Sequence, residues 1–372
     1  MAIVDAITRR VSEGGETLRL GLIKTANAND RLESDWARYG IMKRRMIFYG
    51  NSEVRQLVNT DGGIDFQDPH LGLVPDKLRH GSLGRLDVAL VSCAGVTEDG
   101  KLLPIFDQGY TPVALEMAEK VILEISTESP SELWRLHDVY MRKRLPKKRE
   151  CISITDVMDR IGEPFYSVDP DKVVGIVISD TPMEVLSMWN AADPSPEIDA
   201  ISNYFLSFLE GEIAEGRMPE PLPPVQTGAG AIADAVFAKM GERFSDMTMY
   251  TEGFMSGAVK LIKEGKLTKI SSGGLSVTQE FAEELCAHID EWRQKLVLRS
   301  AEVSNSGEVI SRLGVIAMNN ALEVDLYGNV NSTNAIGTRM ISGIGGSGDY
   351  ARNVFLTVFF TLSTAKDGEI SS

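Results

Sequence analysis

Residues Leu86–Val96 read LDVALVSCAGV, an apolar run with a single charged residue, Asp87. Strands of a parallel sheet have such runs when helices cover both faces, because neither side of the strand then meets water. Two further segments repeat the pattern, KVILEIS at Lys120–Ser126 and KVVGIVIS at Lys172–Ser179. Because helical segments separate these strands, they predict a doubly wound α/β domain with an open, mostly parallel sheet.

Shorter apolar runs precede these strands, at Leu18–Ile23 and Met46–Phe48, and we expect a helix near Asp35–Lys43 between them. The first residues, MAIVDAITRRVSEGG, predict an amphipathic helix and lack the continuous apolar core of a signal peptide. No other segment approaches the roughly eighteen apolar residues that a membrane-spanning helix needs. We therefore expect a cytoplasmic protein that does not span a membrane.

A change of composition marks a boundary in the middle of the chain. The stretch Asp180–Ala200, DTPMEVLSMWNAADPSPEIDA, is rich in Pro and Asp, as linkers are. A helix at Ile198–Glu212 and an extended segment at Met218–Pro224 then lead to the glycine-rich sequence QTGAG. For a chain of 372 residues we expect two α/β domains, residues 1–185 and 186–372, each with an open, mostly parallel sheet.

Charge and cysteine content narrow the function. Lys and Arg number 38 against 53 Asp and Glu, a net charge of −15, which argues against nucleic-acid binding because that depends on cationic side chains. Cys93, Cys151 and Cys286 show neither CxxC nor Cys/His spacing, so we expect neither a disulfide framework nor a metal site. One strongly basic run, Met141–Glu150, predicts a solvated loop, with phosphate binding as the alternative.

The segment Tyr327–Asn353 contains the densest group of glycines. Four of them lie within six residues: Gly343, Gly345, Gly346 and Gly348. Glycine permits positive φ and a close approach of the backbone to a ligand, and successive exposed N–H groups form an anion-binding concavity. A helix predicted at Tyr350–Phe359 would add its positive N-terminal end. The segment therefore predicts a loop that binds a phosphate or an oxyanion, with a plain glycine-rich turn as the alternative.

Glu252 is the candidate for chemistry. The sequence DMTMYTE predicts a strand that ends at Thr251 or Glu252, before Gly253 and a helix from about Met255 to Glu264. Open α/β sheets build their sites at the carboxyl ends of strands, where this carboxylate would lie. A carboxylate in such a place can act as a nucleophile. The alternative is a surface glutamate at the end of a strand.

Four motifs in order resemble those of the acetyl-CoA hydrolase/transferase family, the class I coenzyme A transferases that move CoA between short acids such as acetate, propionate and succinate. The four motifs are VQTGAGAIADAV (Val225–Val236), YTE (Tyr250–Glu252), the run Ala301–Thr333, and GIGGSGDYARN (Gly343–Asn353). The resemblance covers nearly the whole chain. It implies an α/β CoA-transferase fold, CoA as substrate and not as a bound cofactor, a short carboxylic acid as second substrate, and a homodimer.

The resemblance also implies roles for single residues. Glu252 would attack the acyl-CoA thioester and then carry CoA as a glutamyl thioester in a ping-pong exchange. The backbone amides of Ala229 and Gly346 would stabilise the oxyanion, and Asn305 would contact CoA beside the loop glycines Gly343, Gly345 and Gly348. The alternative for Asn305 is an N-cap of the helix predicted after it.

Three functions share these motifs: a CoA transferase, an acyl-CoA hydrolase that lets water reach the glutamyl thioester, and a paralogue that binds CoA without turnover. Relatives in the family carry further segments at both ends, which this sequence is expected to lack. Asn334 stands where many relatives have His, which we expect to alter the acyl pocket. Glu323 and Asp325 are expected to be structural, as are His70 and His80.

Overall fold

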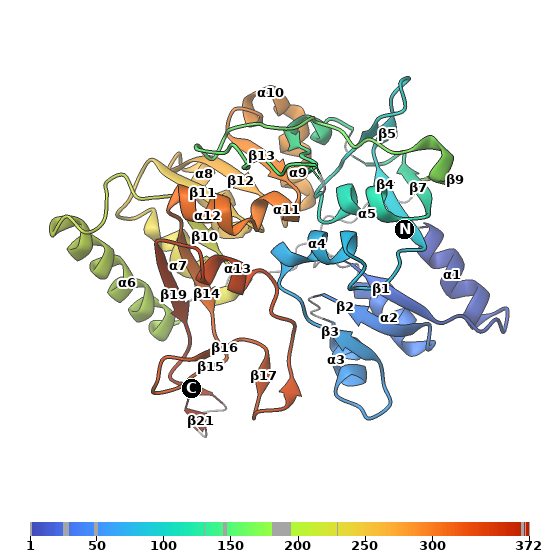
Figure 1. Cartoon of the computed structure of the whole chain (residues 1–372). Helices are drawn as coiled ribbons and strands as arrows, with labels where there is room; N and C mark the ends of the chain where they lie inside the picture. The colour runs from blue at the N-terminus through green and yellow to red at the C-terminus, as the bar shows by residue number, and fades with distance from the viewer. Residues whose placement is uncertain are drawn as a thin grey trace.

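The computed structural model describes residues 2–24, 30–47, 51–129, 131–143, 147–180, 195–228, 230–365, 368 and 370–371. These residues form an α/β structure in which the strands of the three larger sheets run parallel, as predicted (Figure 1). None of the helices described is both long and apolar enough to cross a membrane.

The largest sheet described lies in the C-terminal half and has seven parallel strands. Their order is β19 (Leu356–Phe360), β14 (Ile316–Asn320), β10 (Val225–Thr227), β11 (Met247–Thr251), β12 (Leu267–Ser272), β13 (Leu296–Arg299) and β8 (His137–Asp138). All neighbouring pairs are parallel, so the carboxyl ends of the strands meet at one edge. β8 comes from the first half of the chain, so both halves contribute to this sheet.

Helices cover both faces of the large sheet, as the almost continuous apolar strands predict. On one face, Met249 and Met318 pack in a core with four helices: α6 (Pro196–Ala214), α7 (Ala231–Met240), α8 (Ser256–Lys263) and α9 (Gln279–Ala287). On the other face, Tyr250 and Ala317 pack with α11 (Ala301–Ser304), α12 (Gly307–Leu313) and α13 (Ser347–Ala351). Neighbouring residues of one strand therefore enter opposite cores, as the two-residue period of a strand requires.

The N-terminal half contains two smaller parallel sheets, beside the large one in Figure 1. One is β4 (Val88–Cys93), β7 (Lys120–Ser126) and β9 (Val173–Ser179), which confirms the three predicted strands. The predicted cover on both faces was wrong for β9, because Val174, Ile176 and Ile178 are exposed on one side of it. The other is β1 (Leu20–Ile23), β2 (Met42–Met46) and β3 (Asp65–Gln67). The predicted strands of this half thus divide between two sheets.

Further helices of the N-terminal half are α1 (Ala2–Ser12), α2 (Asp30–Arg38), α3 (Ser52–Val58), η1 (Leu71–Leu73), α4 (Val74–Arg79), α5 (Thr111–Met117), η2 (Leu133–Leu136) and η3 (Pro170–Lys172). The C-terminal half adds α10 (Ile289–Trp292). Short antiparallel pairs are β5 (Gly95–Val96) with β6 (Leu102–Leu103), β15 (Glu323–Val324) with β16 (Val330–Asn331), β17 (Asn334–Ala335) with β18 (Arg339–Met340), and β20 (Thr364–Ala365) with β21 (Ile370–Ser371).

Two predicted helices were wrong in their limits. The helix expected at Tyr350–Phe359 ends at Ala351 in the structure, and the residues Leu356–Phe360 form β19. The aromatic and β-branched sequence LTVFF favours a strand, and its pairing with β14 buries Phe360. The helix expected near Asp35–Lys43 ends at Arg38, because the chain turns there into β2.

The division at residue 185 stays a prediction, because residues 181–194 lie outside the described part of the chain. In the basic run, residues 144–146 lie outside it too. Among the rest, Arg149 binds Asp76 at 2.8 Å and Lys143 binds Glu150 at 2.6 Å. Those cations pair with carboxylates of the chain itself.

Candidate active site

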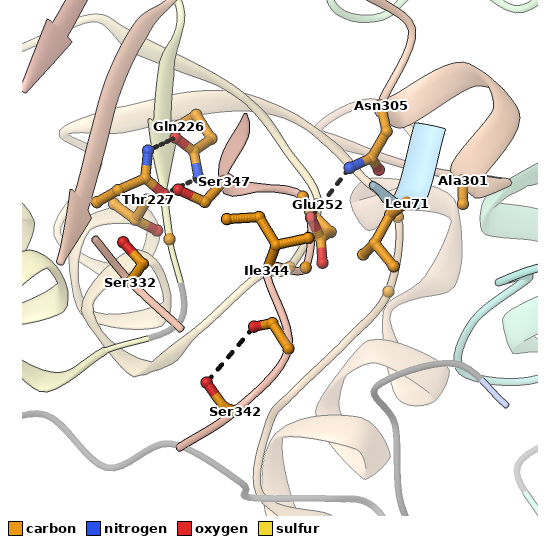
Figure 2. A pocket seen from close by; sticks show the side chains of 18 of the residues that line it. Leu71, Gln226, Thr227, Glu252, Ala301, Asn305, Ser332, Ser342, Ile344 and Ser347 are labelled. Atoms are coloured by element: carbon orange, nitrogen blue, oxygen red, sulfur yellow. Dashed lines mark hydrogen bonds between the residues drawn. The ribbon is translucent and has the colours of Figure 1, made fainter. Parts of the chain in front are cut away.

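A cavity of about 410 Å³ lies at the carboxyl ends of β10, β11 and β14, where open α/β sheets form their sites. The loop that carries Gly343 and Gly346 closes it on one side, and Leu71 of η1 and Tyr110 line it from the N-terminal half. Figure 2 shows Glu252 and Asn305 beside Leu71, with Gln226 and Thr227 across the cavity. The predicted nucleophile and the glycine loop, about ninety positions apart in the sequence, therefore share one cavity.

Glu252 follows the last residue of β11, as predicted, and α8 begins four residues later at Ser256. The side chain is half-buried and faces the cavity. Its Oε2 accepts a hydrogen bond of 3.0 Å from Nδ2 of Asn305 (Figure 2). Burial raises the pKa of Glu252 to about 7; the Asn305 hydrogen bond opposes this rise and the nearby charge of Asp349 adds to it.

Asn305 is buried at the end of α11, and its side-chain amide has three partners. Nδ2 donates to Glu252 and also to Oδ2 of Asp349 at 3.3 Å, while Oδ1 accepts from the Ser304 hydroxyl at 2.8 Å. The alternative prediction of an N-cap was wrong: Ser306 occupies the N-cap of α12, and Asn305 follows α11 as its C-cap. The Asn305 amide thus donates to two carboxylates, Glu252 after β11 and Asp349 in α13.

Gly346 touches the carboxylate of Glu252. A Cβ at this position would lie 1.6 Å from Glu252 Oε2 and 2.3 Å from Asn305 Nδ2, so no side chain fits there without moving both groups. The absence of a side chain at Gly346 thus lets the loop backbone lie against Glu252, and the close approach to a ligand stays a prediction. Gly343 and Gly345 also line the cavity, and Gly345 has φ of 61°. Gly348 is different, because a Cβ there would meet the His70 ring at 2.5 Å, outside the cavity lining.

Of the other predicted residues, Ala229 lies outside the described part of the chain. Asn334 is described but is not among the cavity-lining residues, and its Oδ1 accepts from the Thr333 hydroxyl at 2.6 Å. Asn334 lies in β17, which pairs with β18, and its expected effect on the acyl pocket stays a prediction.

The N-terminal half binds the glycine loop along its length. Both carboxylate oxygens of Asp68 accept from the N–H of Ile344, at 2.9 and 2.8 Å. The N–H of Leu71 donates to the carbonyl of Gly345 at 3.3 Å, and Arg55 Nε donates to the carbonyl of Ile341 at 2.6 Å. These contacts fix a segment that, with four glycines, has few side chains of its own to hold it.

Sequence reasoning missed Asp349 and Asp68. Asp349 is 6% exposed, and burial raises its pKa to about 6; burial likewise raises the pKa of Asp68 to about 6. Asp349 stands inside the quoted motif GIGGSGDYARN, so an acidic residue next to a glycine-rich loop was the available signal. Asp68 carried no local signal, because its partner lies 276 positions away.

No group of three or more His, Cys, Asp or Glu side chains suited to a metal occurs among the residues described. The cavity lining is mostly backbone, amide, hydroxyl and apolar groups, and its charged residues in the described part of the chain are Glu252, Asp107 and Arg55. Most of this lining suits a polar, uncharged chain next to Glu252, while Arg55 and Asp107 add one charge of each sign.

Comparisons with known proteins place the chain in a family. The model of the acetyl-CoA hydrolase/transferase N-terminal domain matches residues 1–177, and that of the C-terminal domain matches residues 282–372. A succinyl-CoA:acetate CoA-transferase of Clostridium kluyveri is 38% identical over 371 residues, which are 100% of this chain and 68% of that protein. The chain belongs to the acetyl-CoA hydrolase/transferase family.

Members of the acetyl-CoA hydrolase/transferase family with different names resemble this chain to similar degrees. An acetyl-CoA hydrolase of Yarrowia lipolytica is 36% identical, over 97% of this chain and 70% of that protein. Among solved structures, RipA from Yersinia pestis superposes with a TM-score of 0.70 at 20% identity, covering 100% of this chain and 77% of RipA. At that identity the superposition supports the fold, and the family membership rests on the sequence matches.

Proposed function

We propose that this chain is an acyl-CoA:carboxylate CoA transferase for short acids of the acetate, propionate and succinate class, with Glu252 as its nucleophile. The observation that carries the proposal is the position of the Glu252 carboxylate. It lies at the carboxyl end of β11 in the cavity, accepts a hydrogen bond from Asn305, and is in contact with the backbone of Gly346. Burial favours the neutral form of such a group, so it is poorly solvated and reactive when ionised.

The proposed reaction begins when a carboxylate oxygen of Glu252 attacks the thioester carbonyl of acyl-CoA. The carbon–sulfur bond breaks, CoA leaves as the thiolate, and an acyl–glutamyl anhydride remains. The thiolate then attacks the glutamyl carbonyl, which releases the free acid and leaves CoA on Glu252 as a thioester. An acceptor acid attacks that thioester and reverses the two steps, so Glu252 is regenerated and a new acyl-CoA leaves.

Each attack creates a tetrahedral oxyanion, and donors aimed at it contribute about 3 kcal/mol each in comparable sites. We assign one donor to the backbone N–H of Gly346 and keep the predicted second donor, that of Ala229. Asn305, Gly343 and Gly345 line the space next to Glu252 and are assigned to CoA contact. Gly348 contacts His70, so we assign it to the support of α13 in place of the predicted CoA contact.

A hydrolase is the second candidate, because the Yarrowia lipolytica relative bears that name. The same glutamyl thioester would then be attacked by water, and both free acid and free CoA would be released. We also propose the homodimer and the cytoplasmic location that the family resemblance implies, which size-exclusion chromatography and cell fractionation would test.

The decisive test is intact-protein mass spectrometry after mixing with acetyl-CoA, propionyl-CoA or succinyl-CoA. A covalent CoA adduct is expected on the wild-type chain and on Glu264→Ala, a change of an exposed glutamate just after α8. Glu252→Ala should form none. Excess acetate should return the wild-type mass together with new acetyl-CoA, whereas loss of the adduct in buffer alone would indicate the hydrolase. A folded wild-type chain that forms no adduct and turns nothing over would refute both enzymes and leave the CoA-binding paralogue.

A further inference from the structure

We infer that Asp349 is a positioning residue that keeps the Asn305 amide aimed at Glu252 through both halves of the reaction. This inference rests on the proposed role of Glu252 as nucleophile. Asp349 lies in the first turn of α13 and is 6% exposed. It is absent from the residues that line the cavity, so it acts through Asn305 and does not itself meet the substrate.

One oxygen of Asp349 connects two parts of the chain. Oδ2 accepts from the N–H of Gly72 at 2.8 Å and from Nδ2 of Asn305 at 3.3 Å. The same Nδ2 donates to Glu252 Oε2 at 3.0 Å, so one amide nitrogen lies between two carboxylates. The Ser304 hydroxyl donates to the amide oxygen at 2.8 Å. A flipped Asn305 would point its oxygen at both carboxylates, and the structure therefore specifies one orientation of the amide.

The need for Asp349 differs between states of the reaction. While Glu252 is a carboxylate, its own charge attracts the Asn305 donor. Once Glu252 is an anhydride or a thioester it is neutral, and its carbonyl oxygen attracts the donor less. Asp349 forms no covalent bond in the anhydride or the thioester, so it can keep its negative charge. Hydrogen bonds to charged acceptors are roughly twice as strong as those to neutral ones, so Asp349 continues to attract the Asn305 donor. The Nδ2 donor of Asn305 thus stays next to the position at which the glutamyl oxyanion forms in the second half of the reaction.

Asp349 also fixes the cavity wall. The space around Gly72 is closed: a Cβ there would lie 2.5 Å from the Asn305 carbonyl oxygen and 3.2 Å from Asp349 Cγ. The segment Leu71–Leu73 therefore packs directly on α11 and α13, and Leu71 lines the cavity beside Glu252. Loss of Asp349 should loosen the amide and this wall together, while the rest of the cavity keeps its shape.

Two variants separate the charge of Asp349 from its hydrogen bonds. Asp349→Asn can retain an oxygen acceptor for Gly72 and Asn305 but removes the negative charge. Asp349→Ala removes both. Asp234→Asn is the matched control, because Asp234 is a carboxylate that is 1% exposed, accepts from the Gly257 N–H at 3.0 Å and does not line the cavity.

We expect Asp349→Ala to lower kcat about tenfold to a hundredfold, as for a misplacement near 1 Å, with KM for acyl-CoA changed less than about threefold. Asp349→Asn should lower kcat less and shift the acid limb of the kcat/KM profile to lower pH. The titratable groups next to Glu252 are Asp349 and the buried Tyr110 and Tyr350, while Arg55 and Asp107 line the same cavity and Arg352 faces Asp349. Removal of the Asp349 charge should therefore make Glu252 easier to ionise. Asp234→Asn should change neither kcat nor the acid limb of the kcat/KM profile.

A folded Asp349→Ala that keeps wild-type kcat would overturn the inference. If that variant does not fold, Asp349→Asn decides: an unmoved acid limb overturns the inference and a shift to lower pH supports it. The mass of the wild-type chain after mixing with acyl-CoA separates this test from that of the proposed function. Without a wild-type adduct the role of Glu252 fails, whereas an adduct combined with unaffected Asp349 variants refutes only the role of Asp349.

Discussion

At the residue scale, Glu252 is a carboxylate that the fold makes hard to ionise. Its surroundings provide one hydrogen bond from Asn305, a nearby acidic side chain and the backbone of Gly346, and they bring no described cation into contact with it. The group is therefore held in a place that favours its neutral form. Two measurable consequences follow, one for activity and one for stability.

The first consequence is an acid limit on activity. With the pKa of Glu252 raised to about 7, the carboxylate needed for attack is lost as pH falls through that value. We expect kcat/KM to fall about tenfold per pH unit below roughly pH 7, since this profile reports groups of the free enzyme. Circular dichroism at each pH should confirm that the chain stays folded. A flat profile down to pH 5 would show that the attacking group ionises normally.

The second consequence concerns stability. Because the pKa of Glu252 in the folded chain, about 7, exceeds its ordinary value of 4.5, the folded state holds its proton more tightly than the unfolded state. This contribution is fully present below pH 4.5 and is lost as pH rises through 7. It amounts to about 1.4 kcal/mol for each pH unit between the two values, hence at most about 3 kcal/mol.

Glu252→Gln cannot ionise, so it should be more stable than wild type at pH 8 and nearly equal to it at pH 4. Urea unfolding at the two pH values measures the difference. Equal stability at pH 8 would contradict the raised pKa, and a loss of stability at both values would point to a packing defect of the glutamine.

At the element scale, the glycine loop and α13 act as one unit held by the N-terminal half. Asp68 holds the N–H of Ile344, Leu71 holds the carbonyl of Gly345, and Asp349 receives the N–H of Gly72. The loop reaches Glu252 because it has no side chain at Gly346 and because these contacts fix its backbone.

Gly346→Ala should therefore damage the site directly. The added methyl group would lie 1.6 Å from Glu252 Oε2, so the carboxylate must move by on the order of 1 Å, and turnover should fall at least about a hundredfold. Acyl-CoA binding, measured by calorimetry, should weaken much less. Gly211→Ala, in α6 with nothing within 4 Å of the new Cβ, is the control and should keep full activity. Equal losses of binding and turnover would instead assign Gly346 to ground-state CoA binding.

At the scale of the whole molecule, a buried ion pair between Arg79 and Glu302 joins the two halves next to the site. Arg79 of α4 donates from Nη2 to Oε2 of Glu302 in α11 at 2.9 Å. It also donates from Nε to Oε2 of Glu116 in α5 at 2.7 Å. Arg79 is 5% and Glu302 8% exposed. Since α11 ends next to Asn305, this pair also fixes the base of the amide that contacts Glu252.

Arg79→Met should lower the free energy of unfolding by about 3 to 5 kcal/mol, because it leaves the Glu302 charge buried without its main partner. The double variant Arg79→Met with Glu302→Leu should recover most of that loss. Urea unfolding of the three chains measures both effects. If the single variant were as stable as wild type, Glu302 would have to be solvated or protonated in the folded chain.

The sequence by itself determined the α/β class, the strands β1, β4, β7, β9 and β11, and the position of Glu252 at the end of a strand near a glycine-rich loop. Those features depend on local patterns: apolar runs, the period of two in strands, and glycine where the backbone must approach a neighbour. Local pattern failed at Tyr350–Phe359, where pairing with β14 made a strand of the last residues.

Only the tertiary structure decided which residues surround Glu252. Asn305 lies 53 positions from it, and Asp349 lies 44 positions from Asn305 and 277 from Gly72. A sequence shows that these side chains can donate or accept, but not which of them meet. The partner of a buried amide or carboxylate is set by how the sheet edge, η1, α11 and α13 pack, because burial leaves each polar group dependent on whichever donor the fold brings to it.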